Sequence, residues 1–331
     1  VSSFIQQGVA YGYLVYSVIN KHFGIGSFTM YLAAINSFSG AMFSLMDSVV
    51  DLRRFSDFYG AVDKYLNMEK RQREGKRLPL GRSADPVIEF RNVSFRYPNQ
   101  EQYTLKNVNI TIKGGEKLSI VGENGAGKTT FIKLLTRFYR PTEGAIYLNG
   151  VDIQDYDYDN YADMFSVLFQ DFALFVMPLR DNITLGRPIE DKDIVTALEQ
   201  SGFRDKFDKL EKGLDTAVYK TFDETGFEPS GGEGQKIAMA RALLKGAPVV
   251  VLDEPTAALD PRAEYEMYMR FNEMVRKKTA IFISHRLASV KFCDAVAVFK
   301  NGEIAEYGTH DELMKKQGLY NELFTMQAQF Y

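Results

Sequence analysis

The residues with the most specific spacing lie at positions 122–129, which read Gly-Glu-Asn-Gly-Ala-Gly-Lys-Thr. They fit the pattern G-x-x-x-x-G-K-[ST] without a mismatch and follow an apolar run typical of a strand, Leu118–Val121. Such glycines let backbone N–H groups turn inward around phosphate oxygens, and a following helix directs its partly positive N-terminus at the same anion. Lys128 would reach the β- and γ-phosphates, and the Thr129 hydroxyl would bind Mg²⁺. The residues predicted to surround the phosphates are Gly122, Glu123, Asn124, Gly125, Ala126, Gly127, Lys128, Thr129 and Thr130.

A second group of chemically active residues follows the apolar run Val249–Leu252, where the chain continues with Asp253 and Glu254. A buried parallel strand delivers such residues to its carboxyl end, where ligands bind in open α/β sheets. We expect Asp253 to hold Mg²⁺, directly or through water. Glu254 would act as the general base that polarises an attacking water, a role worth about 10²–10⁴-fold in rate. An isolated Asp-Glu pair more often caps a strand at the surface, but the upstream phosphate loop reverses that preference.

A third segment, Ser230-Gly231-Gly232-Glu233, comes just before a predicted helix, residues 235–244. Its backbone N–H groups and its hydroxyl predict a second anion site on the same chain. The phosphate loop, this segment and the Asp-Glu strand, in that order, resemble the motifs of ATP-binding cassette (ABC) proteins, in which the segment corresponds to the signature motif. The resemblance covers essentially residues 85–331. With the apolar N-terminal segment, the whole resembles the C-terminal part of a bacterial exporter-type half-transporter.

The resemblance assigns roles to further residues. Tyr97 matches the aromatic residue that stacks on adenine, and Gln170 matches a glutamine that touches Mg²⁺ and water. His285 matches a histidine that contacts the γ-phosphate, and Asp260 lies in a loop that crosses between two ATPase subunits. ATP and Mg²⁺ are the implied cofactors, and Glu254, His285, Lys128 and Gln170 the implied catalytic residues.

The same resemblance implies a second half-transporter as partner. The segment 230–233 of one chain would close over the ATP bound by the other chain, so that ATP joins a head-to-tail dimer. Pro229 stands where the family usually has leucine, and residues 219–228 also depart from the usual pattern. A modified signature beside an intact Glu254 fits a heterodimer, and a homodimer remains an equal alternative.

The elements that must position these residues alternate between strand and helix. Apolar strand patterns occur at residues 87–95, 108–112, 118–121, 165–169, 249–252, 280–283 and 295–299, and a helical pattern at 131–138. This order favours an α/β fold with a mostly parallel sheet, in which the early strands form an antiparallel edge. The resemblance specifies an α/β P-loop NTPase with a helical subdomain, preceded by transmembrane helices.

Charged side chains are absent from residues 1–20 and again from residues 23–46. As a helix the second run would be roughly 36 Å long, and a bilayer core of about 30 Å needs about 20 such residues. Basic residues gather past Asp51, which marks the cytoplasmic side of a span. The pattern predicts two membrane spans, residues 1–19 and 24–50, with further spans upstream. A buried core helix of a soluble domain is the alternative.

The predicted organisation therefore has three parts. Residues 1–54 would be the end of a transmembrane domain, residues 55–82 a cytoplasmic helical linker, and residues 83–331 the nucleotide-binding domain. The 40 basic and 43 acidic residues leave a net charge of −3, which gives no reason to expect a nucleic-acid partner. The expected localisation is a bacterial plasma membrane, multi-pass, with the nucleotide-binding domain in the cytoplasm.

Three functions remain open at this point. The leading one is ATP-driven export of an amphiphilic substrate, a lipid, a peptide or a drug-like molecule. The second is a soluble cassette ATPase that acts on macromolecules, against which the charge-free runs argue. The third is an ATP-binding regulatory subunit; the argument against it is that four residues are intact, Lys128, Asp253, Glu254 and His285.

Overall fold

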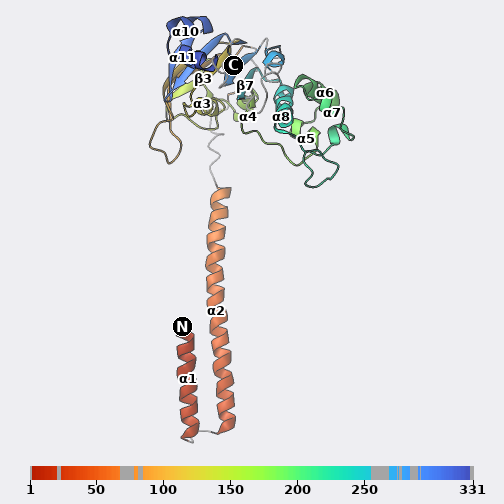
Figure 1. The fold of residues 1–331 in the computed structure, drawn as a ribbon. Coiled ribbons are helices and arrows are strands. Elements are labelled where there is room, and N and C mark those ends of the chain that lie inside the picture. Colours follow the sequence, from red (N-terminus) through yellow and green to blue (C-terminus); the bar gives the residue numbers. More distant parts are fainter. Residues whose placement is uncertain are drawn as a thin grey trace. The chain divides into compact units, whose positions relative to one another are not determined.

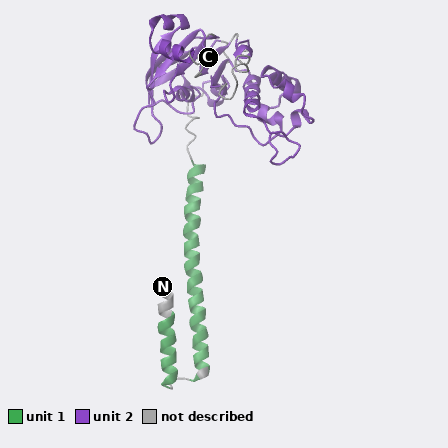
Figure 2. Cartoon of the chain, in the orientation of Figure 1, with its two compact units in different colours: residues 1–70 green, residues 71–331 purple. Residues whose placement is uncertain are grey.

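The computed structural model describes residues 2–20, 24–67, 78–80, 85–254, 268–273, 275, 278–283, 290 and 292–328. The chain divides into two compact units, residues 1–70 and 71–331 (Figure 2). Asp260 and His285 lie outside the described residues.

The first unit consists of two helices, α1 (Ser2–Ile19) and α2 (Ile25–Leu66). They run side by side in opposite directions (Figure 1), and the Tyr11 hydroxyl donates a hydrogen bond to Asn36 Oδ1 between them. Many of their apolar side chains face outward, including Phe55 and Phe58, which are 71% and 70% exposed. The helical pattern past Asp51 is thus part of α2, which continues to Leu66. Among the described helices, none is both long enough and apolar enough to traverse a membrane.

The second unit contains a six-stranded sheet whose order is β10-β9-β3-β8-β7-β6. Five of these strands are parallel and β10 is antiparallel to β9. All five residues of β7 are buried, as expected for a parallel strand covered on both faces. The strands are β3 (Lys117–Gly122), β6 (Phe165–Leu168), β7 (Val249–Asp253), β8 (Thr279–Ile283), β9 (Ala295–Lys300) and β10 (Glu303–Gly308).

The sequence analysis predicts that the early strands form an antiparallel edge of that sheet, and this prediction is wrong. They build a second, antiparallel sheet of order β2-β1-β4-β5. The chain leaves β2 through a turn at Gly114, where a Cβ would lie 2.5 Å from the Asp85 Cβ, so the turn requires glycine. The antiparallel edge of the main sheet is instead β10, a strand the sequence patterns did not predict. The strands of the second sheet are β1 (Ile88–Phe95), β2 (Leu105–Ile112), β4 (Glu143–Leu148) and β5 (Val151–Asp152).

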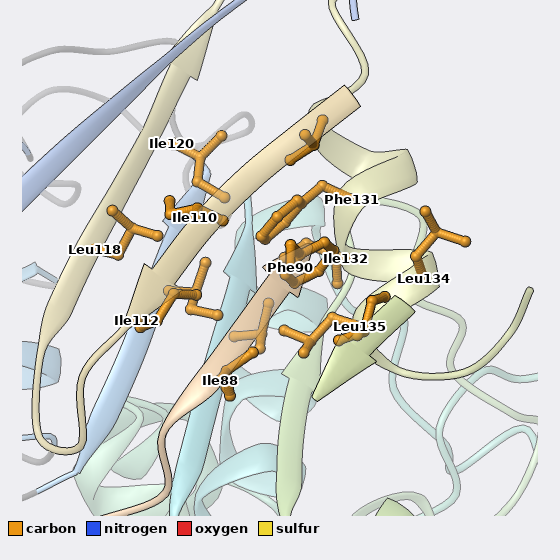
Figure 3. Packing of buried hydrophobic residues seen from close by; sticks show 14 of the residues in the cluster. Ile88, Phe90, Ile110, Ile112, Leu118, Ile120, Phe131, Ile132, Leu134 and Leu135 are labelled. Carbon is orange, nitrogen blue, oxygen red and sulfur yellow. The ribbon is translucent and has the colours of Figure 1, made fainter. Parts of the chain in front are cut away.

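Apolar residues from both sheets and from the first helix of the unit share one core (Figure 3). Phe90 of β1 stacks on Phe131 of α3 with ring centroids 4.1 Å apart. Because Phe131 also contacts Phe299 of β9, α3 is fixed against both sheets. The helices of the unit whose bounds the structure describes are α3 (Lys128–Leu135), α4 (Tyr158–Ala162), α5 (Leu179–Thr184), α6 (Asp191–Gln200), α7 (Arg204–Phe207), α8 (Gly231–Lys245), α10 (His310–Lys316) and α11 (Leu319–Ala328), with 3-10 turns η1 (Ile153–Asp155) and η2 (Gly213–Asp215).

A helical subdomain, α5 to α8, has a core of its own. Leu179 and Ile183 of α5, Leu198 of α6 and Ile237 of α8 are each fully buried in it. This core is distinct from the one beneath the phosphate loop, so the subdomain carries residues 230–233 on a separately packed body (Figure 1). The arrangement agrees with the helical subdomain that the resemblance implied.

Candidate functional site

The phosphate loop joins the end of β3 to the start of α3 and requires glycine at two positions. A Cβ at Gly122 would lie 2.3 Å from the Phe299 carbonyl oxygen. Gly127 has φ +103°, and a Cβ there would lie 2.5 Å from a methyl group of Leu105. The loop is therefore packed against β9 and β2, and at these two positions its backbone path is available only to glycine.

Lys128 begins α3, and its side chain turns back over the loop. Its Nζ donates hydrogen bonds to the carbonyl oxygens of Gly122 and Glu123, each at 2.9 Å, and the residue is 5% exposed. Burial lowers the pKa of Lys128, while Glu254 and Asp253 raise it. These interactions hold a cation at the centre of the loop, where a phosphate can take over its hydrogen bonds.

Asp253 ends β7 as a buried carboxylate, 1% exposed. Neither carboxylate oxygen has a hydrogen-bond partner among the residues that the structure describes. Burial raises the pKa of Asp253 to about 6; the Thr129 hydroxyl and Lys128 act in the opposite direction, although neither forms a hydrogen bond that satisfies the carboxylate. Buried polar atoms are nearly always paired, so this carboxylate calls for a ligand. Oxygen donors of this kind fit Mg²⁺, with Asp253 and Thr129 as the residues that can hold it.

Replacing Asp253 with Asn is expected to stabilise the nucleotide-free chain at pH 7.5. The carboxyl has a folded-state pKa of about 6 against an ordinary 3.8, so keeping it charged in the folded state costs on the order of 3 kcal/mol. The raised pKa means that the folded state binds the proton more tightly. The cost is therefore absent below pH 4, grows between pH 4 and 6 and is complete above pH 6.

Thermal unfolding followed by circular dichroism suits a chain without tryptophan. The Asp253→Asn variant should unfold several degrees above the parent at pH 7.5, and the difference should shrink at pH 5. Asp311→Asn, on the surface of α10, serves as the control and should show no such pH-dependent gap. A variant that unfolds below the parent at pH 7.5 would contradict the assignment of Asp253 as an unpartnered buried charge.

Glu254 and Gln170 follow the ends of two neighbouring parallel strands. Leu168 of β6 pairs with Leu252 of β7, so both strands end at the same edge of the sheet. The backbone N–H of Glu254 donates to the Ile283 carbonyl oxygen of β8 at 3.0 Å, which fixes the residue with φ +49°. Asp171, which the sequence analysis missed, acts electrostatically on Asp253; its position directly after Gln170 was the available signal.

Tyr97 is held beside α3 by its hydroxyl, which lies 3.0 Å from the Thr130 hydroxyl oxygen. Its ring meets Phe95 and Tyr139 edge-on, with centroids 5.0 and 5.2 Å away. The Lys133 ammonium lies 6.0 Å from the ring centroid. Tyr97 is therefore fixed to α3, the helix that carries Lys128. The sequence pattern alone did not reveal this contact.

Ser230 is the N-cap of α8, and the helix begins at Gly231, earlier than the predicted residue 235. The Glu233 N–H donates to the Ser230 hydroxyl oxygen at 3.3 Å, and the Ser230 N–H donates to a Glu233 carboxylate oxygen at 2.9 Å. Lys206 of α7 forms an ion pair with Glu233 at 3.1 Å. The capping box uses the N–H groups of Ser230 and Glu233, so the N–H that Pro229 lacks removes no hydrogen bond from it.

Arg241 lies about three turns after Ser230 on α8 and links this helix to the segment after Gln170. Its Nε donates to the Asn182 carbonyl oxygen at 2.8 Å and its Nη2 to the Ala173 carbonyl oxygen at 3.2 Å. The Asn182 amide in turn bonds to the backbone of Phe175 in both directions. The signature helix and the chain leaving Gln170 are thereby linked through described contacts.

Comparison with known proteins gives the same picture. Residues 105–257 match the family model described as "ABC transporter". The subtilin transport ATP-binding protein SpaT of Bacillus subtilis is 36% identical over 304 residues, 90% of this chain and 49% of that protein. An ATP-dependent lipid A-core flippase of Haemophilus ducreyi is 33% identical over 99% of this chain and 56% of its own length.

Among solved structures, a bacterial Atm1-family ABC exporter with ATP bound matches with a TM-score of 0.74 and 28% identity. The match covers 98% of this chain and 57% of that one. The chain thus spans about half the length of the curated relatives it matches. With the phosphate loop, the buried Asp253 and the capped Ser-Gly-Gly segment on a two-sheet fold, the second unit of this chain is an ABC transporter ATP-binding domain.

Proposed function

We propose that the chain is the ATP-hydrolysing part of a membrane ABC exporter. The observation that carries the proposal is the buried Asp253 at the end of β7. Its two oxygens lack hydrogen-bond partners among the described residues, and it interacts electrostatically with Lys128 at the start of α3. A phosphate-binding lysine beside an unsatisfied carboxylate suits Mg²⁺ and a nucleoside triphosphate. The family of the second unit and its relatives' names support export.

In this proposal each residue has a defined role. Lys128 and the loop N–H groups bind the β- and γ-phosphates, while Thr129, Asp253 and Gln170 hold Mg²⁺, which would neutralise the charge that develops on the phosphates. Glu254 orients the attacking water and accepts its proton. Tyr97 would stack on adenine. His285 would contact the γ-phosphate and Asp260 would face a second subunit; both lie outside the described residues.

The proposed partner is a second half-transporter, identical or different. Ser230 and Gly231 are exposed at the N-terminus of a 15-residue helix, so a phosphate on another subunit can reach them. Closure over ATP and release after hydrolysis would drive alternating access. The proposed substrate class is amphiphilic, because one relative is named for subtilin and another for the lipid A-core. No residue described in this chain selects between the two.

A Ser230→Ala variant tests the role of the cap in hydrolysis. Loss of an N-cap costs about 1 kcal/mol of stability. The chain offers a matched control because Thr309 and Glu312 form the same kind of capping box at the start of α10. We expect Ser230→Ala and Thr309→Ala to lower the unfolding temperature similarly, while only Ser230→Ala lowers ATP hydrolysis, by about tenfold or more. Equal hydrolysis in the two variants would contradict a role for Ser230 at the partner's ATP.

We further propose that α1 and the first part of α2, residues 1–19 and 24–50, lie in a bacterial plasma membrane with the second unit in the cytoplasm. The absence of charge from residues 24–46 supports this placement. Flotation of the expressed chain with vesicles after a carbonate wash tests it. Recovery of the chain in the soluble fraction would favour the alternative, a soluble cassette ATPase acting on macromolecules. ATP binding without hydrolysis by the chain together with its co-purifying partner would favour a regulatory subunit.

A further inference from the structure

A pocket of about 320 Å³ lies in the helical subdomain and is lined by residues of α7 and of the segment between α7 and α8. This volume falls at the lower end of the range for small-molecule sites, which begins near 300 Å³. The lining combines ammonium groups, hydroxyls and apolar surface. Its residues are Lys206, Lys209, Leu210, Glu211, Lys212, Thr216, Thr225 and Phe227.

The charge of the lining is mainly positive, with three lysines against one glutamate. Lys206 pairs with Glu233 at 3.1 Å, and Lys212 pairs with Asp223 at 2.9 Å. Within the described part of the chain, Lys209 forms no ion pair. The pocket therefore offers one uncommitted cation and two that already bind carboxylates at its rim, which is a suitable setting for a further anion.

Thr216 gives an independent indication of a ligand. The residue is 3% exposed, and its hydroxyl has no hydrogen-bond partner among the described residues. Its backbone is already used, because its N–H donates to the Gly213 carbonyl oxygen and its carbonyl oxygen accepts from the Leu179 N–H. Leaving a buried hydroxyl unsatisfied is unfavourable, and a ligand in the pocket can accept its hydrogen bond.

The apolar part of the lining indicates what carries the anion. Phe227 is 8% exposed, and the Lys206 ammonium lies 5.8 Å from its ring centroid. Leu210 adds a second apolar wall. We propose that this pocket binds a small organic phosphate, with the phosphate group at the lysines and Thr216 and an aromatic or apolar body against Phe227 and Leu210.

The position of the pocket connects it to the signature segment. Lys206 would contact the bound phosphate, and it also pairs with Glu233, whose other carboxylate oxygen accepts from the Ser230 N–H. A bound phosphate and the N-cap of α8 would therefore share one ammonium group. The site is separate from the ATP site built on Lys128, so the proposal stands or falls independently of the function proposed above.

Isothermal titration of phenylphosphonate into the full chain tests the proposal, because this probe combines a dianion with a ring and cannot be hydrolysed. We expect binding that persists in a Lys128→Ala variant, which disables the phosphate loop. Binding should weaken about tenfold in Lys209→Gln and in Thr216→Val, each of which removes one polar contact. Inorganic phosphate should bind more weakly than phenylphosphonate because it lacks the ring.

Both pocket variants are chosen to leave the fold intact. Lys209 is exposed, and valine has nearly the shape of threonine, so Thr216→Val should raise rather than lower the unfolding temperature. Three results would each overturn the proposal: no binding to the parent chain, binding lost in Lys128→Ala, or binding unchanged in both pocket variants. Equal affinity for inorganic phosphate would overturn the part of the proposal that places an aromatic or apolar group against Phe227 and Leu210.

Discussion

A Glu254→Gln chain is expected to bind Mg²⁺·ATP as the parent does and to hydrolyse it about 10²–10⁴-fold more slowly. The amide has nearly the shape of the carboxylate but cannot accept a proton from water. The backbone position of residue 254, fixed by its hydrogen bond to Ile283, should be unchanged. Phosphate release and nucleotide titration, run on the same preparation, separate the two steps.

The backbone of Glu254 supports the choice of this residue. Its φ of +49° is a conformation that non-glycine residues rarely adopt, and such positions cost on the order of 1–3 kcal/mol. A carboxylate side chain at such an unfavourable backbone position suggests that the side chain has a function that offsets this cost. Glu322→Gln, exposed on α11, is the matched control and should leave hydrolysis unchanged. Parental hydrolysis by Glu254→Gln would remove Glu254 from the role of base.

A Lys128→Ala chain is expected to lose ATP binding as well as hydrolysis. The ammonium group makes charge-assisted hydrogen bonds worth about 1.5–3 kcal/mol each, so its loss should weaken ATP binding roughly 10- to 150-fold. The side chain also joins the Gly122 and Glu123 carbonyl groups of the loop, and these lose their donor. Asp253 would then lose the nearby cation that lowers its pKa and so favours its charged form.

Equilibrium titration with a fluorescent ATP analogue measures this effect. Lys106→Ala, on the exposed side of β2, is the matched control and should bind as the parent does. The comparison with Glu254→Gln is informative because one variant should lose binding and the other only turnover. ATP affinity within twofold of the parent in Lys128→Ala would contradict the assignment of residues 122–129 as the phosphate loop.

The central part of the fold could be predicted from the sequence because its signals are local. Buried parallel strands such as β7 appear as continuous apolar runs, and the glycine-rich loop identifies where β3 gives way to α3. Asp253 was expected at the end of its strand, and the structure has it there, buried beside Lys128.

Other features could not be predicted because they depend on contacts distant in sequence. Whether β1 and β2 join the main sheet or form another depends on the pairing of β1 with both β2 and β4 and on the turn at Gly114. The sequence pattern predicts a helix over residues 131–138, whereas α3 begins three residues earlier, with Lys128, Thr129 and Thr130 in its first turn. Likewise, the link from Tyr97 to Thr130 spans 33 residues and leaves no local pattern.

Phosphate release from ATP by the purified chain in lipid, with and without Mg²⁺, tests the central claim most directly. It should be made on the chain alone and on the chain with any subunit that co-purifies with it. The account predicts release that requires Mg²⁺, stops in Glu254→Gln and stops in Lys128→Ala. No Mg²⁺-dependent release in either preparation, although ATP binds, would contradict it.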